Sequence, residues 1–154
     1  MDQPAPSSMD YLRMAAASDL YEIQSSQLVL QTTQDTGLRA FAQKMIDHHT
    51  MTTATLMGAA RDAGLTPPAP ALDATKSQMI AQLQAAQAGA RDALYKQQQV
   101  VAHREALALH TSYSTNGDAP QLKTAARTAV PIVAEHYNQI TAMHGDASAG
   151  HSGH

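Results

Sequence analysis

Apolar and small residues recur at helical spacing in the first part of the chain. Between Met9 and Thr33 the inward positions return every three or four residues and form a stripe roughly 100° wide, as in an amphipathic helix. The stripe consists of Leu12, Ala15, Ala16, Asp19, Ile23, Ser26 and Leu30. Asp35-Thr36-Gly37 interrupts the pattern, and Asp35 is a suitable N-cap for a further helix. We therefore predict a first helix over 9–33.

A second stripe follows Asp35 and predicts a helix that ends near Ala63. Its inward positions are Leu38, Phe41, Ala42, Met45, His49, Thr52, Leu56, Ala59 and Ala60. Gly64 is expected to terminate the helix, because glycine adopts the left-handed conformation common after the last turn. The next segment, Thr66-Pro67-Pro68-Ala69-Pro70, is rich in proline and predicts a stiff extended connector.

The helical pattern resumes after the connector. Asp73 is a suitable cap for a third helix that continues to about Ala88. Glycine is costly inside a helix, so we expect a break at Gly89 and a new helix over 90–113.

The last helix is predicted over 120–143. A turn at 116–119 precedes it, and proline at 120 suits a first helical turn. Pro131 lies inside this helix and predicts a kink or a missing hydrogen bond. The segments outside the helices are expected to be a flexible leader over 1–8 and a disordered, histidine-bearing tail over 144–154. The helical domain then covers 9–143.

These elements predict an all-α fold. Four long helices joined mostly by short loops make an antiparallel up-down four-helix bundle, with one extra short helix at the proline-rich crossing. The composition agrees, because the apolar 44% is rich in Ala and Met and includes one Phe and no Trp. Small, flexible side chains suit packed helices better than a β-sandwich. A chain of 154 residues is enough for one such domain.

Composition also excludes several classes of function. The net charge is −3 and there is no basic stripe, so nucleic acid is not an expected partner. Without cysteine, disulfides, thiolate metal sites and thiol catalysis are impossible. No apolar run reaches the roughly 18 residues of a membrane span. The leader is consistent with the mature end left after removal of an export signal.

Four polar residues on four different helices point inward or to the edge of the apolar stripe: Glu22, His49, His103 and His136. Glu22 and His49 lie about equally far from the turn at Asp35, which puts them level in an antiparallel hairpin. His103 and His136 differ by about five residues in their distance from Gly117, or roughly 7–8 Å along a helix. We therefore expect the four side chains to meet near mid-bundle.

Two interpretations of this polar layer stay open. Burying an unpaired polar group costs about 1–3 kcal/mol, so the four side chains must satisfy one another, water or a metal. Imidazole and carboxylate together are ligands for Zn, Cu or Fe. Alternatively, the layer is a structural device that sets helix register. Asp19 is expected to partner a nearby Arg or His, and Asp92 and His110 to be neighbours of the layer, rather than ligands.

The stretch Phe41-Ala42-Gln43-Lys44-Met45-Ile46-Asp47-His48-His49-Thr50 resembles the bacterial proteins grouped as domain-of-unknown-function family 4142. Further matching pieces span Asp10 to Met143 and include the surroundings of Glu22, Asp92-Ala93-Leu94-Tyr95 before His103, and Val130-Pro131 before His136. The family usually shows Asp-His where this chain has His48-His49, so the carboxylate of that pair is replaced here by His48.

The resemblance implies a ferritin-like bundle and a periplasmic or otherwise exported location, and it implies no established activity. Glu135 is adjacent to His136, and Glu105 follows His103 by two positions. Neither pair has the Glu-x-x-His spacing of di-iron proteins, so a mononuclear or histidine-rich site fits better than a dinuclear oxidase.

We therefore hypothesise a periplasmic protein that binds or handles a metal through Glu22, His49, His103 and His136, as a monomer or homodimer. The alternative is a non-catalytic envelope or stress-related interaction protein whose buried layer is structural. A metal-dependent redox or hydrolytic enzyme is a third hypothesis, for which the sequence selects no substrate.

Overall fold

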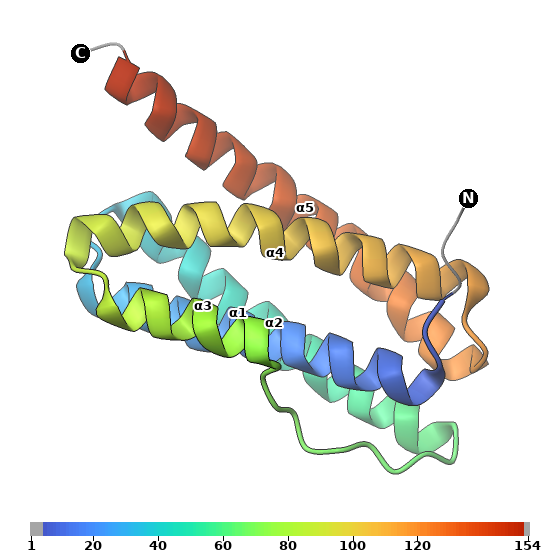
Figure 1. Cartoon of the computed structure of the whole chain (residues 1–154). Helices are drawn as coiled ribbons and strands as arrows, with labels where there is room; N and C mark the ends of the chain where they lie inside the picture. The colour runs from blue at the N-terminus through green and yellow to red at the C-terminus, as the bar shows by residue number, and fades with distance from the viewer. Residues whose placement is uncertain (1–4, 153–154) are drawn as a thin grey trace.

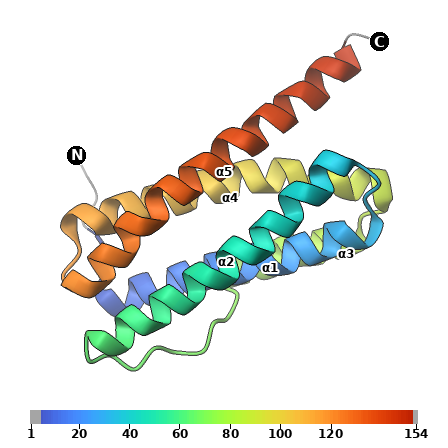
Figure 2. The same ribbon diagram turned by 180° about the vertical axis from the view of Figure 1, so that it is seen from behind.

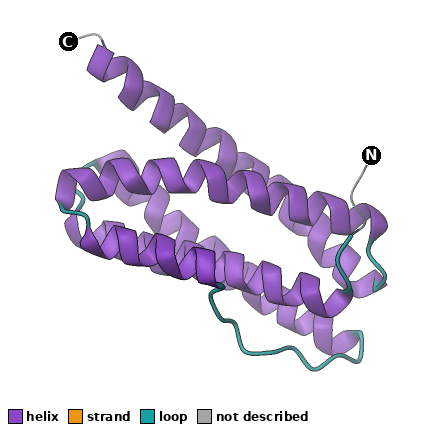
Figure 3. Cartoon of the chain, viewed as in Figure 1, coloured by secondary structure: helices purple, strands orange, loops and turns teal. Residues whose placement is uncertain are grey.

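A computed structural model of the protein describes the backbone of residues 5–152 and the side chains as far as residue 144. The described part contains helices and loops and no strand (Figure 3). The elements are α1 (Ser8–Thr32), α2 (Thr36–Asp62), α3 (Ala74–Ala85), α4 (Ala88–Asn116) and α5 (Pro120–Ser152). None of the helices in this part is long and apolar enough to cross a membrane.

The four long helices form a bundle in which neighbours are antiparallel. α1 packs against α2 and α4, and α5 packs against the same two helices. The connector after α2 and the short α3 return the chain along α1, so that α2 and α4 run in the same direction (Figures 1 and 2). The predicted four-helix bundle with an extra short helix after the proline-rich segment is thereby confirmed.

Local signals set several helix ends. The Asp35 and Asp73 carboxylates accept hydrogen bonds from the backbone N–H of Leu38 and Lys76, at 3.0 and 2.8 Å. Gly64 has a φ of 78°, and its N–H donates to the Arg61 carbonyl, so it closes the last turn of α2 as expected.

The break was predicted at Gly89, but the boundary between α3 and α4 lies before that residue. α3 ends at Ala85 and α4 begins at Ala88, so Gly89 is in the first turn of α4. The reason is tertiary: the buried Arg91 donates to the carbonyls of Leu83 and Ala86, which ends α3 early.

The last helix also differs from its prediction. α5 continues through Pro131 and past Met143 to Ser152. No proline follows Met143 to stop it, and Figure 1 shows this end extending beyond the other helices. The predicted tail over 144–154 lies partly outside the described residues, as does half of the leader over 1–8.

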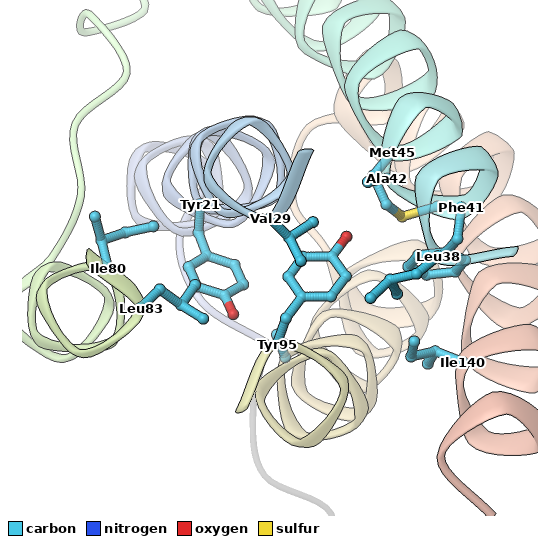
Figure 4. Close-up of a cluster of buried hydrophobic side chains, with 11 residues drawn as sticks. Tyr21, Val29, Leu38, Phe41, Ala42, Met45, Ile80, Leu83, Tyr95 and Ile140 are labelled. Atoms are coloured by element: carbon cyan, nitrogen blue, oxygen red, sulfur yellow. The ribbon is translucent and has the colours of Figure 1, made fainter. Parts of the chain in front are cut away.

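Two apolar clusters fill the bundle on either side of a polar layer. The first lies toward the α1–α2 turn (Figure 4) and contains Tyr21, Val29, Leu38, Phe41, Ala42, Met45, Ile80, Leu83, Tyr95, Ala102 and Ile140. The second lies toward the opposite end and contains Tyr11, Leu12, Ala15, Ala16, Leu56, Ala60, Tyr113, Leu122 and Ala126. Apolar packing on both sides keeps the layer between them away from bulk water.

Candidate metal centre

The four residues singled out in the sequence are all buried between these clusters. Glu22 is 2% exposed, His49 3%, His103 1% and His136 0%. One ring nitrogen of each histidine lies within 4.8 Å of the others. Oε1 of Glu22 lies 3.9 Å from Nδ1 of His103. The structure thus brings together side chains from α1, α2, α4 and α5.

The three imidazoles lie close together with their ring planes at large angles to one another. The centroid of His136 is 5.5 Å from that of His49 and 5.7 Å from that of His103. His49 and His103 are edge to face, with their centroids 6.2 Å apart. The centre is therefore a convergent group of rings rather than a stack.

Asp19 orients the His49 ring. Its Oδ1 lies 2.8 Å from Nδ1 of His49 and accepts the hydrogen of that nitrogen, so Nε2 of neutral His49 carries a lone pair. Burial acts to lower the pKa of His49. The hydrogen bond to Asp19 and the negative charges of Asp19 and Glu22 outweigh burial and raise the pKa. Asp19, buried on the inward stripe of α1, is thus confirmed as the partner of a histidine.

A backbone carbonyl orients the His103 ring. Nδ1 of His103 lies 2.8 Å from the carbonyl oxygen of Gln99, one turn earlier on α4. A carbonyl can only accept, so Nδ1 carries the hydrogen and Nε2 carries the lone pair. The sequence did not predict this role of Gln99, because the contact uses the backbone carbonyl and does not depend on the residue type.

His48 orients the third ring. Its Nδ1 lies 2.8 Å from Nε2 of His136, and the two rings stack with centroids 4.9 Å apart. When His136 donates its Nε2 hydrogen to His48, Nδ1 of His136 carries the lone pair. Burial lowers the pKa of His136 to about 2, and the neighbouring histidines and Lys44 act in the same direction. The residue at which this chain departs from the family pattern is thus in direct contact with the centre.

Four buried atoms of the centre have no hydrogen-bond partner among the described residues. They are Glu22 Oε2, His49 Nε2, His103 Nε2 and His136 Nδ1. With the hydrogen bonds above, each of the four is a hydrogen-bond acceptor and an electron-pair donor. One water donates only two hydrogens and satisfies at most two of them. One ring nitrogen of each of the three histidines belongs to a group within 4.8 Å, so one cation can accept an electron pair from all three, and Glu22 lies beside this group. The donor set therefore fits a transition-metal ion.

Two other polar residues on the His103 face of α4 have hydrogen-bond partners of their own. The Tyr11 hydroxyl lies 2.8 Å from Nδ1 of His110, and the Thr33 hydroxyl donates to Asp92 at 2.9 Å. His110 and Asp92 thus each have a protein partner at a different height of α4 from His103, and the second carboxylate oxygen of Asp92 has no partner among the described residues.

Solved structures with a similar fold include a crystal structure of a DUF305 fragment from Deinococcus radiodurans. It has a TM-score of 0.77 at 14% identity, over 94% of this chain and 99% of that one. CopM in the Cu(II)-bound form gives a TM-score of 0.76 at 14% identity, over 92% and 98%. CopM in the Cu(I)-bound form gives 0.74 at 15%, over 92% and 97%. At these identities the similarity shows the fold alone.

No protein of curated function matches the chain in sequence. The family model described as domain of unknown function DUF4142 matches residues 1–143. This match covers nearly the whole described bundle, including the stretches around Glu22, His49, His103 and His136. The chain therefore belongs to the DUF4142 family.

Proposed function

We propose that this protein binds a single transition-metal ion through His49, His103 and His136, with Glu22 as the fourth ligand. The observation that carries the proposal is the group of three histidine nitrogens within 4.8 Å of one another. Glu22 lies beside the group and keeps one buried oxygen without a partner among the described residues, so it supplies the fourth donor in this proposal. Each imidazole also has its other nitrogen hydrogen-bonded on the far side, to Asp19, to Gln99 or to His48. This is how metal-binding histidines are held in proteins.

The chemistry of the donors narrows the choice of metal to Cu(II), Zn(II) or Fe(II). Three neutral imidazoles and one carboxylate are borderline ligands, which suit these ions better than Mg²⁺ or Ca²⁺. The similar fold of CopM, described in copper-bound forms, makes copper the first ion to test. A bound ion supplies Lewis-acid or redox chemistry, but the proposal is binding or handling of the metal.

The alternative function is an envelope or stress-related interaction protein whose polar layer is structural. A structural layer is stable when its buried polar groups are paired, because an unpaired group costs about 1–3 kcal/mol. Asp19, His48 and Gln99 satisfy one nitrogen of each ring, but among the described residues the other nitrogen of each ring has no such partner. The unpaired atoms therefore favour the metal hypothesis.

Metal titration of the protein without a histidine tag tests the proposal. We expect the stripped protein to bind one equivalent of Cu(II) or Zn(II) in competition with a chelator of known affinity. Removing a ligand, as in His103→Gln, is expected to weaken binding at least about 100-fold. The matched control is His144→Gln at an exposed position of α5, which should bind like the wild type.

Circular dichroism shows whether His103→Gln keeps the helical fold. His151 and His154 are present in both variants, so any metal that they bind contributes equally to the comparison. Absence of a tight equivalent in the wild type would show that the layer is structural. Equal affinity of the two variants would show that the ion binds elsewhere.

The proposal includes a periplasmic or otherwise exported location, which the family resemblance implies. An exported protein meets metal ions outside the cytoplasm, where a binding protein can intercept them. Fractionation of the source cells, with a cytoplasmic enzyme as marker, tests the location. Recovery of the protein with that marker would contradict it.

A further inference from the structure

The proposed ligand atoms are completely buried, so a cation cannot reach them along the surface. Their oxygen and nitrogen atoms lie behind packed side chains from four helices. A metal that binds and leaves on a useful timescale needs a path into the bundle. Cavities along the junction between α2 and α5 are the candidates for this path.

A cavity of about 110 Å³ lies at this junction. Its outer rim includes exposed residues of α2 and α5, among them Met51, Thr55 and Thr128. Its inner wall includes the buried residues Asp19 and His110. The cavity therefore leads from the surface to a side chain that contacts the centre.

The cavity lies next to the centre along both helices. Thr52 lines it one turn after His48 on α2, and Ile132 lines it one turn before His136 on α5. Residues four apart lie on the same helix face. Asp19 lines the cavity and hydrogen-bonds to His49 at 2.8 Å. The His49 ring thus lies directly behind the inner end of the cavity.

The charges in this cavity favour a cation. Asp19 is an anionic group at its inner end, and the Thr52 and Thr53 hydroxyls donate to that carboxylate at 3.0 Å. His110 adds no positive charge at neutral pH, because burial lowers its pKa to about 4. The remaining titratable group that lines the cavity is the Tyr11 phenol, whose pKa is raised by burial and which stays neutral.

A second groove at the α2–α5 junction lies on the other side of His136. It is lined by Phe41, Lys44, Gln139 and Ala142, among others. Its charged group is the ammonium of Lys44, which hydrogen-bonds to Gln139 at 3.0 Å and repels an approaching cation. The Phe41 ring stands between this groove and the rings of His103 and His136. The positive charge of Lys44 thus disfavours a cation in this groove, whereas the negative charge of Asp19 favours one in the first cavity.

We propose that the cavity beside Asp19 is the passage through which a transition-metal cation enters and leaves the buried centre. Asp19 is the first anionic group that the cation meets, and the His49 ring is the gate behind it. This inference rests on the proposed metal-binding function and adds the route to the site.

Filling the mouth of the cavity tests the route. Thr128→Phe places a ring at the exposed rim without touching a proposed ligand, and Thr55→Phe does the same from α2. We expect stopped-flow rates of Cu(II) or Zn(II) binding, and of release to a chelator, to fall together by about tenfold. The dissociation constant should stay unchanged, because the passage alters the barrier and leaves the bound state as it was.

Ala142→Phe is the matched control, because it fills the groove beside Lys44 from the same helix. It should bind and release the metal at the wild-type rate. Wild-type rates in both Thr128→Phe and Thr55→Phe would overturn the passage, as would slowing by Ala142→Phe alone. Failure of the wild type to bind metal at equilibrium would instead remove the proposed function, so the two failures are distinguishable.

Discussion

Each imidazole of the centre is oriented by a hydrogen bond on the side away from the shared space. A neutral imidazole has one N–H donor and one lone pair, so binding one nitrogen decides what the other can do. A carboxylate holds His49, a backbone carbonyl holds His103, and a second imidazole holds His136. Each ring therefore keeps one nitrogen lone pair that can bind a proton or a metal cation.

Asp19→Asn tests how much this orientation contributes to binding. The amide oxygen still accepts the hydrogen bond from His49, but the negative charge that raises the pKa of His49 is lost. We expect metal affinity at pH 7 to fall about tenfold, the low end for loss of a group that supports a ligand. Competition titration measures the change.

Asp10→Asn, an exposed carboxylate on the same helix, is the control for Asp19→Asn and should bind like the wild type. An unchanged affinity in Asp19→Asn would mean that hydrogen-bond geometry alone, without charge, prepares the ring. A complete loss of folded protein would be visible by circular dichroism and would call for Asp19→Glu as the milder change.

At the scale of the elements, α3 is attached by a side chain from the helix that follows it. The Arg91 guanidinium donates to the carbonyls of Leu83, Gln84 and Ala86 at the end of α3, and to Leu28 on α1. Ile80 and Leu83 add the apolar contact with the core. A short helix of this length is marginal without such contacts.

Arg91→Met keeps the aliphatic stem and removes all the donors. We expect the free energy of unfolding to fall by about 3 kcal/mol, because charged hydrogen bonds are lost and buried carbonyls are left unpaired. Amide exchange over 74–85 should rise first. Arg127→Met, at an exposed position of α5, is the control and should change stability little.

The metal centre provides an internal check on the Arg91→Met result. α3 contributes no residue to the proposed ligand set or to the hydrogen bonds that hold it. Arg91→Met should therefore bind metal with wild-type affinity as long as the four long helices stay folded. A parallel loss of binding would show that α3 supports the centre through the bundle.

At the scale of the whole molecule, burial between two apolar clusters favours the neutral form of two histidines, His110 and His136. The folded pKa of His110 is lowered to about 4 and that of His136 to about 2. Between these values and the unfolded value of about 6.5, the unfolded chain binds more protons. The stabilisation is thus present above about pH 6.5 and is lost as the pH falls.

His49 acts in the opposite direction. Its folded pKa is raised, so its contribution is fully present below about pH 6.5 and is lost as the pH rises through the folded value. Over the acidic range the His49 contribution is constant, and the two lowered histidines determine the slope. The metal-free protein should therefore lose stability steadily from pH 6.5 to pH 4.

Denaturant unfolding of metal-free protein at several pH values tests this linkage. The shift of His110 corresponds to about 3 kcal/mol lost by pH 4. His110→Gln keeps an acceptor for the Tyr11 hydroxyl but cannot titrate, so its stability should depend less on pH. The exposed control His144→Gln should keep the full wild-type dependence. Equal slopes in all three proteins would contradict the assignment to His110.

Much of this architecture was decided by the sequence alone. Periodicity identified the four long helices and the caps at Asp35, Gly64 and Asp73, because these features depend on neighbours within a turn or two. The same periodicity predicted that Glu22 and the three histidines lie on the inward faces of their helices. A side chain's face on its own helix is a local property, so it can be read without knowing the partner helix.

Tertiary structure decided what those inward side chains contact. Counting from Gly117 left His103 and His136 offset by about five residues, yet their rings meet. His103 lies 13 residues before the end of α4 at Asn116, and His136 lies 16 residues after the start of α5 at Pro120. The residues of the turn between the two helices account for part of the offset that was counted from Gly117.

The sequence also did not predict the hydrogen bonds that determine which ring nitrogen of His49 and His136 keeps its lone pair. Asp19 and His48 belong to other helices than the rings they hold, so their pairing depends on how close the helices approach. The early end of α3 depends on Arg91 in the same way. Local spacing determines which residues enter the interior, whereas distances between helices determine which of them become partners, and only folding sets those distances.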